Sequence, residues 1–313
     1  MTLQSPRIRD RIDLGFSRQE LALIAITVVW GATFLVIHLA MRHSGPLFFV
    51  GVRFATAGVV SLVVFRNVMA GLTMRELAVG SVTGVTIFIG FSLQTLGLQT
   101  ISSSESAFLT ALYVPIVPLL QWLVFRRRPR LMSWVGIGLA FTGLVLLAGP
   151  TASPLTLSRG AFATVISAFA FAAMILLIGR FAGETDSRRM TVIQLLTASI
   201  LSLMVMPIVG ETIPSFAWGW VAPAFGLGIA SAFIQLTMNW AQRTVSATRA
   251  TVIYAGEPVW GGVFGWMAGD RLPALAGVGA ALIVAGVLAS ERKEPPRVPR
   301  GQVPIPDPSA GAG

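Results

Sequence analysis

Residues 99–118 read QTISSSESAFLTALYVPIVP, and residues 242–261 read QRTVSATRATVIYAGEPVWG. The second stretch lies 143 residues after the first, and at this offset the two stretches and the segments behind them share residues without a gap. The pairs are Gln99 and Gln242, Ser103 and Ser246, Ala107 and Ala250, Pro115 and Pro258, Gly136 and Gly279, Leu139 and Leu282, and Gly143 and Gly286. Biased composition explains part of the agreement, but the matching Gln and Pro favour a true duplication.

Both copies belong to long apolar blocks that are separated by short polar breaks. A block of about 20 residues matches the roughly 30 Å hydrocarbon core of a bilayer at 1.5 Å rise per residue. Hydrocarbon cannot satisfy open backbone groups, so we expect these blocks to be helices. The ten predicted spans are 20–40, 46–65, 77–99, 105–125, 131–149, 159–180, 190–209, 218–240, 248–268 and 273–290.

The composition agrees with a membrane protein. Hydrophobic residues make up 54% of the chain, charged residues only 12%, and the mean hydropathy is +0.77. A soluble domain has roughly 45–50% apolar and 25% charged residues. The net charge of +10 does not indicate nucleic-acid binding, because the charges lie at the ends of the apolar blocks.

The basic residues predict the topology. With the N-terminus in the cytoplasm, 19 of the 23 lysines and arginines fall in cytoplasmic segments, whereas Arg42, Arg159 and Arg271 lie outside and Arg53 lies within a span. The positive-inside rule therefore favours a multi-pass protein of the inner (plasma) membrane with both termini in the cytoplasm.

The offset of the duplication equals five spans, so the two halves enter the membrane with opposite polarity. We therefore expect an all-α integral membrane fold with ten transmembrane helices, arranged as a five-plus-five inverted repeat around a site near the midplane. The expected segments are a cytoplasmic N-terminal segment (1–19), the first repeat (20–149), the second repeat (159–290) and a proline-rich, disordered cytoplasmic tail (291–313). Alternatively, the duplication only built a stable bundle.

Several catalytic classes are excluded by composition. The chain has no cysteine, and its one lysine, Lys293, lies in the tail, so a phosphate-binding loop with its lysine is absent. The two histidines, His38 and His43, both lie around the first span. We expect no catalytic residues, no metal and no cofactor, and we predict that the protein is not an enzyme.

Four motifs carry a resemblance to a known family: Trp30-Gly31-Ala32-Thr33-Phe34, Arg53-Phe54, Glu257-Pro258 and the glycine-rich segment 277–286. With these motifs the chain, over about residues 20–290, resembles the EamA-type ten-helix members of the drug/metabolite transporter (DMT) superfamily. Among them it is most similar to bacterial exporters of amino acids, including aromatic amino acids. The resemblance implies a central cavity and secondary transport. The first half departs from the pattern, because Val114-Pro115 stands where the second half has Glu257-Pro258.

Two charged residues are predicted well inside spans, away from the span ends. Glu257 lies near the middle of the ninth span, where a carboxylate costs roughly 2.5–3.5 kcal/mol unless it is protonated, paired or hydrated. It could recognise a substrate amine, take up a proton or serve only as a structural carboxyl beside the Pro258 kink. Arg53 could hold a substrate carboxylate bidentately, or it could snorkel outwards or bind a neighbouring helix.

The other candidates are polar and aromatic residues of the spans. The predicted substrate-binding set is Trp30, Thr33, Phe34, His38, Arg53, Gln94, Tyr113, Gln235, Asn239, Tyr254 and Glu257, and the predicted hinges are Pro115, Pro118 and Pro258. His38 could titrate at physiological pH or be structural. Aromatic rings with a few amides suit zwitterions that carry hydrophobic side chains.

These features predict a secondary transporter that exports small metabolites, above all aromatic or hydrophobic amino acids, by alternating access. The expected partners are a small-molecule substrate and the lipid bilayer, and a monomer is compatible with this function. The alternatives are a flippase for lipids or lipid carriers, a structural or receptor role and, at a lower rank, an intramembrane enzyme.

Overall fold

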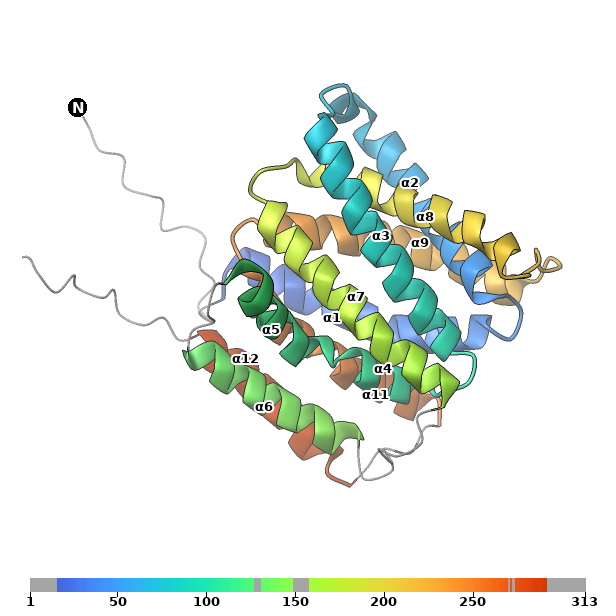
Figure 1. The fold of residues 1–313 in the computed structure, drawn as a ribbon. Coiled ribbons are helices and arrows are strands. Elements are labelled where there is room, and N and C mark those ends of the chain that lie inside the picture. The colour runs from blue at the N-terminus through green and yellow to red at the C-terminus, as the bar shows by residue number, and fades with distance from the viewer. Residues whose placement is uncertain (1–15, 127–130, 149–157, 270, 272–273, 292–313) are drawn as a thin grey trace, which may run out of the picture.

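The structure, a computed structural model, describes residues 16–126, 131–148, 158–269, 271 and 274–291. These residues form a bundle of helices (Figure 1). The helices are α1 (Arg18–Ala40), α2 (Pro46–Met69), α3 (Met74–Gly97), α4 (Ser103–Thr110), α5 (Tyr113–Phe125), α6 (Leu131–Ala148), α7 (Arg159–Phe181), α8 (Ser187–Ile208), α9 (Trp218–Ala241), α10 (Ala247–Tyr254), α11 (Glu257–Met267) and α12 (Ala276–Glu291). The predicted tail and most of the predicted N-terminal segment lie outside the described residues.

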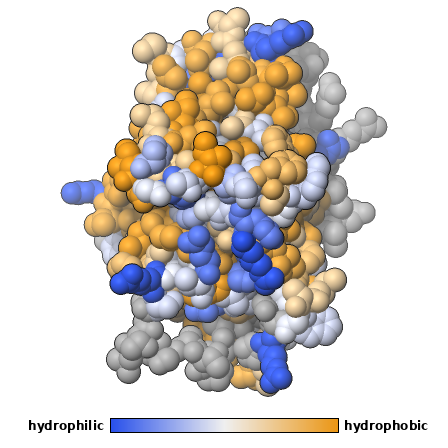
Figure 2. Space-filling model, turned by 90° about the vertical axis from the view of Figure 1, so that its right-hand side faces the viewer, coloured by the Kyte–Doolittle hydropathy of each residue, from blue (hydrophilic) through white to orange (hydrophobic). Residues whose placement is uncertain are grey.

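The helices have the length and surface of membrane spans. Among the described residues, seven helical segments are long and apolar enough to cross a bilayer, if α4 and α5 are taken as one segment. The shorter apolar helices α6 and α12 and the pair α10–α11 complete the ten predicted spans. Many large apolar side chains are exposed, as expected where lipid is the solvent. On the side shown in Figure 2, hydrophobic residues surround a patch of hydrophilic ones.

The fourth and ninth spans are each interrupted, and the prolines explain where. Pro115 has no N–H to donate to the carbonyl of Ala111, and Val114 N–H donates to it at 2.9 Å instead, in a tighter turn. Pro258 likewise cannot bond the carbonyl of Tyr254. The breaks therefore fall before these prolines, between α4 and α5 and between α10 and α11. Pro118 lies inside α5, and the hinge role predicted for the three prolines stays a prediction.

The packing of the helices repeats when the two halves are exchanged. The helix α3 packs against α7 and α8, and its counterpart α9 packs against α1 and α2. The same exchange relates the pair α5–α7 to α11–α1 and the pair α4–α11 to α10–α5. The pairs α2–α8 and α6–α12 are their own counterparts and lie at opposite edges of the bundle (Figure 1). The predicted five-plus-five inverted repeat is therefore confirmed.

Glycines show the symmetry at atomic detail. A Cβ added to Gly84 would lie 2.7 Å from the carbonyl oxygen of Gln194, and a Cβ added to Gly228 would lie 2.8 Å from that of Arg53. Arg53 and Gln194 thus occupy equivalent places in α2 and α8. In the α6–α12 pair, a Cβ on Gly286 would lie 2.6 Å from the carbonyl oxygen of Gly136. Because these glycines have no side chain, the backbones of the paired helices can approach closely.

Ion pairs join the two halves on one membrane face, which we call the N face because α1 begins there. The Glu76 carboxylate of α3 accepts hydrogen bonds from Arg189 (3.1 Å) and from the backbone N–H of Asp186 (3.0 Å). Glu20 of α1 pairs with Arg249 of α10 at 3.0 Å. These contacts place the start of α3, the start of α8 and the start of α10 on the face where α1 begins, as antiparallel halves require.

Candidate functional site

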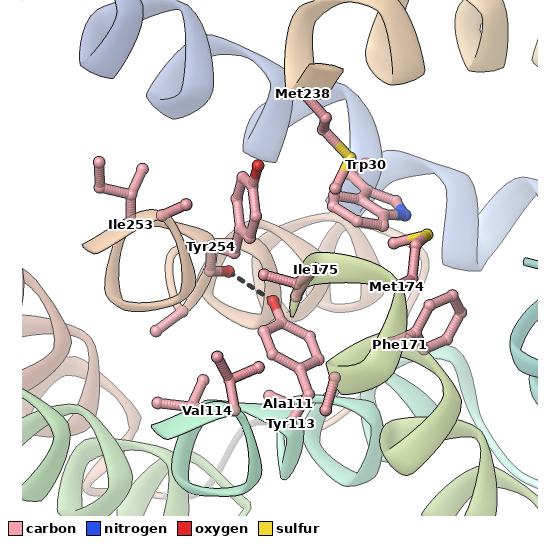
Figure 3. Packing of buried hydrophobic residues seen from close by; sticks show 14 of the residues in the cluster. Trp30, Ala111, Tyr113, Val114, Phe171, Met174, Ile175, Met238, Ile253 and Tyr254 are labelled. Carbon is pink, nitrogen blue, oxygen red and sulfur yellow. Dashed lines mark hydrogen bonds between the residues drawn. The ribbon is translucent and has the colours of Figure 1, made fainter. Parts of the chain in front are cut away.

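The two interrupted spans meet in the middle of the bundle. Tyr113, the first residue of α5, directs its hydroxyl toward the break in the other span (Figure 3). Its oxygen lies 3.0 Å from the carbonyl oxygen of Tyr254 and 3.0 Å from Oε2 of Glu257. The Tyr254 carbonyl is the one that Pro258 leaves without its helical donor. A side chain of the first half thus supplies the bond that the proline removed from the second.

Glu257 is buried and poorly compensated. Its side chain is 1% exposed, and within the described residues its Oε1 has no hydrogen-bond partner and no cation lies within ion-pair distance. The position at the first turn of α11 favours a negative charge by about 0.3–1 kcal/mol. Burial of a carboxylate at this depth costs about 2.5–3.5 kcal/mol, so the cost of burial is the larger effect.

Aromatic and amide side chains surround this pair. Trp30 of α1 meets the Tyr254 ring edge to face, with ring centroids 5.8 Å apart. The Tyr254 hydroxyl accepts a hydrogen bond of 3.2 Å from Gln242 Nε2. Close approach of α1 is possible because the residue after Trp30 is Gly31, where a Cβ would lie only 2.8 Å from the carbonyl oxygen of Glu257. Steric contact with α11 therefore explains why the Trp-Gly-Ala-Thr-Phe motif has a glycine at position 31.

Arg53 forms a second buried site. Its Nε donates to Ser231 Oγ of α9 at 2.8 Å, and its guanidinium lies over the rings of Phe91 (4.9 Å) and Phe54 (5.3 Å). Its Nη1 is buried and has no partner among the described residues. At 1% exposure the side chain does not snorkel outwards, so that alternative is excluded. Among the residues that the structure describes, this cation has no counter-ion.

The Arg53 site is connected to the Tyr113 site by aromatic packing. The Phe91 ring meets the Phe171 ring of α7 edge to face at 4.9 Å. Phe91 and Phe171 belong to the same buried cluster as Trp30, Tyr113 and Tyr254. No hydrogen bond or ion pair joins Arg53 to Glu257 within the described part of the chain.

The remaining amide candidates are buried in contacts between helices. Gln94 donates to Thr110 Oγ1 of α4 at 3.1 Å. Gln235 of α9 accepts a hydrogen bond of 3.1 Å from Gln194 Nε2. Its Nε2 contacts the sulfur of Met174, which lies one helical turn after Phe171. Asn239 donates to the hydroxyl of Thr191 at 2.9 Å.

The contacts of three candidates in the first helix are with residues other than Tyr113, Glu257 and Arg53. Thr33 donates back to the carbonyl of Trp30 at 2.7 Å, and Phe34 belongs to a separate apolar cluster with Phe49. His38 Nδ1 lies 3.0 Å from the carbonyl oxygen of Leu98, near the C-terminal end of α1. Their predicted part in substrate binding stays a prediction.

Sequence reasoning missed the partners that define the Arg53 site. Ser231, Phe91 and Phe171 are ordinary residues of apolar spans, and no local pattern distinguishes them. Gln194 occupies in α8 the place that Arg53 occupies in α2, but the sequence offset of 143 residues pairs Arg53 with Leu196, so only the structure reveals this equivalence.

Comparison with known proteins decides the family. The model of the EamA-like transporter family matches residues 18–149 and again residues 158–290. The chain belongs to the EamA-like transporter family. This family consists of transporters, which agrees with the prediction that the protein is not an enzyme.

Individual EamA-like relatives agree with this assignment. An uncharacterized transporter of Archaeoglobus fulgidus is 30% identical over 42% of this chain and 40% of its own length. The uncharacterized inner membrane transporter YedA of Escherichia coli is 28% identical over 40% of this chain. The chain thus covers only 40% and 42% of the length of these two relatives. The uncharacterized transporter YoaV of Bacillus subtilis is 19% identical over 85% of this chain and 94% of its own length.

A solved structure shares the fold. A crystal structure with 18% sequence identity superimposes with a TM-score of 0.69 and covers 87% of this chain and 96% of its own chain. At this identity the likeness shows the fold alone.

Proposed function

We propose that this EamA-like protein is a secondary transporter of the inner membrane that exports zwitterionic metabolites by alternating access, and that aromatic or hydrophobic amino acids are its substrates. The inverted repeat is the architecture in which two halves can exchange inward-open and outward-open conformations. The family match supports transport, and the finer statement rests on the two buried charged residues.

The observation that carries the proposal is a cation and a carboxyl group that are both buried and not paired with each other. Arg53 comes from the first half with a free Nη1, and Glu257 comes from the second half with a free Oε1, among the described residues. A buried guanidinium is suited to a carboxylate because it can bind both oxygens. The rings of Phe91, Phe171 and Trp30 offer an apolar surface to a side chain.

The basic residues support cytoplasmic termini. Arg189 and Arg249 bind carboxylates on the N face, and Arg75 and Arg180 both pair with Glu184 there. The positive-inside rule assigns such a face to the cytoplasm. Export then proceeds from the N face to the opposite face.

Reconstituted transport tests the proposal. Proteoliposomes are assayed with a panel of radiolabelled amino acids, with and without a proton gradient. We expect saturable flux for aromatic and large aliphatic amino acids and none for the corresponding amines, which lack the carboxylate. The Arg53→Met variant tests the carboxylate site and is expected to reduce flux strongly. If no amino acid shows saturable flux, the substrate class is wrong, and altered envelope lipids on overexpression would then indicate a flippase.

A further inference from the structure

The junction between the two interrupted spans contains more acceptors than hydrogens. Tyr113 has one hydroxyl hydrogen, yet its oxygen lies 3.0 Å from two acceptors, the Tyr254 carbonyl and Glu257 Oε2. The carbonyl has lost its helical donor to Pro258, and a buried carbonyl requires a replacement. If the tyrosine hydrogen points to the carbonyl, the tyrosine oxygen presents only lone pairs to Glu257.

One additional hydrogen supplies a donor for both close contacts of the Tyr113 oxygen. A protonated Glu257 donates from Oε2 to the Tyr113 oxygen, and Tyr113 donates onward to the Tyr254 carbonyl. Oε1 then becomes the carbonyl oxygen of a neutral acid, which agrees with its lack of a donor among the described residues. A charged carboxylate would leave two buried oxygens and one buried carbonyl to compete for a single hydrogen.

We infer that Glu257 is a proton-binding site, and that its proton closes a latch in which Tyr113 ties the interrupted span of the first half to that of the second. Loss of the proton weakens the latch, because Tyr113 can then donate to either the carbonyl or the carboxylate but not to both, and one of the two hydrogen bonds between the spans is lost. Tyr113 is a positioning residue in this arrangement and need not touch the substrate. The inference deepens the proposed transport function by naming an ion that one conformation of the protein must bind.

Other titratable groups of the surrounding helices do not compete for this proton. The elements packed against α11 are α1, α4 and α6, and Tyr113 and Tyr254 begin α5 and end α10. Tyr254 faces Glu257 with its carbonyl, while its hydroxyl is bonded to Gln242. The charged or titratable residues of these neighbours are placed at helix ends: Arg18, Glu20 and His38 on α1, Glu105 on α4 and Arg249 on α10.

Infrared spectroscopy tests the inference directly and without substrate. Full-length protein in lipid is compared with the Glu257→Gln variant in the region of the carbonyl stretch of protonated carboxylic acids. We expect the wild-type protein to show a band that Glu257→Gln removes. The Tyr113→Phe variant is expected to shift this band, because the acid loses its acceptor. Tyr254→Phe is the matched control and should leave the band in place, since the latch uses the backbone of Tyr254.

A second measurement, cysteine labelling, follows the opening of the junction between the two interrupted spans. The chain has no cysteine, so a single cysteine at Ala111, which is buried at the first break, reports its opening. Labelling rates are normalised to the denatured protein at each pH. We expect wild-type labelling to rise about tenfold from acidic to alkaline buffer, the change that the loss of one ordinary hydrogen bond produces. Glu257→Gln should label slowly and Tyr113→Phe rapidly at every pH.

Two outcomes would overturn the latch. One is an infrared spectrum that Glu257→Gln leaves unchanged, and the other is labelling with the same pH dependence in all three proteins. Because both measurements omit substrate, a protein that shows the band and the latch but carries no amino acid would contradict the proposed function alone.

Discussion

Replacement of Arg53 by methionine distinguishes a binding residue from a structural one. In the membrane interior an arginine costs about 2.5–3.5 kcal/mol. The structure offsets this cost with one hydrogen bond to Ser231, worth about 1.5–3 kcal/mol for a charged donor, and with stacking on Phe91 and Phe54, worth about 2 kcal/mol when desolvated. The two sides nearly balance. We therefore expect Arg53→Met to change the free energy of unfolding by no more than about 2 kcal/mol.

Lysine at the same position should be worse than methionine. The ammonium keeps the cost of a buried charge but loses the planar stacking and the Nε geometry, so we expect Arg53→Lys to lose about 2–3 kcal/mol of stability. Transport should fall in both variants, because a charge-assisted carboxylate bond of about 1.5–3 kcal/mol corresponds to roughly a 10- to 150-fold change in apparent affinity.

The assay combines unfolding titrations in mixed micelles with flux measurements in proteoliposomes. The expected signature is a stable Arg53→Met protein that does not transport. If Arg53→Met instead unfolds with a loss of more than about 3 kcal/mol and retains flux wherever it folds, Arg53 is a structural residue and the carboxylate site is wrong.

Three further perturbations follow from the fold. A leucine at Gly143 should destabilise the α6–α12 pair by about 1–3 kcal/mol, because a Cβ there would lie 2.9 Å from Ile283 Cγ1. A leucine at Gly138, where a Cβ would meet no atom within 4 Å, is the control and should leave the free energy of unfolding unchanged in the same titration. The hydrogen bonds of the Arg188 side chain lower the pKa of Asp186 from 3.8 to about 2. Its stabilising contribution is therefore complete above pH 3.8 and is lost as the pH falls toward 2, and Asp186→Asn should remove this acid dependence of thermal unfolding. Cysteines at the exposed positions 102 and 246, which precede α4 and α10, should react with an impermeant reagent from opposite sides of the membrane, with position 246 labelled from the cytoplasm.

The topology could be predicted because its signals are local. Ten apolar blocks, a duplicated set of glutamine, glycine and proline residues, and arginines at alternate ends are each visible without knowledge of tertiary contacts. The family match and the repeated helix packing confirm the spans and their inverted duplication. The kink expected at Pro258 is also local, and in the structure the Tyr254 carbonyl that this proline leaves without its helical donor is bonded by Tyr113.

The contacts of the site could not be predicted, because the helices are apolar on nearly every side. Lipid and protein interior demand similar residues, so periodicity does not reveal which face of a span is buried. The partnership of Arg53 with Ser231 and Phe91 joins three spans that are far apart in sequence. Pro115 was predicted as a hinge, but the tighter turn that Val114 closes just before it could not be located from the sequence.

The two halves share a backbone fold but carry different side chains at the junction. This difference can make the two conformations of a transporter unequal in stability. At the offset of 143 residues, Tyr113 corresponds to Gly256 and Glu257 corresponds to Val114. If the halves exchange conformations during transport, no hydroxyl or carboxyl group occupies the equivalent places, and the latch cannot form in the exchanged state. The inverted repeat thus supplies two conformations of similar geometry, while the Tyr113–Glu257 junction stabilises only one of them. A proton that binds at this junction biases that equilibrium, because it binds one conformation better than the other.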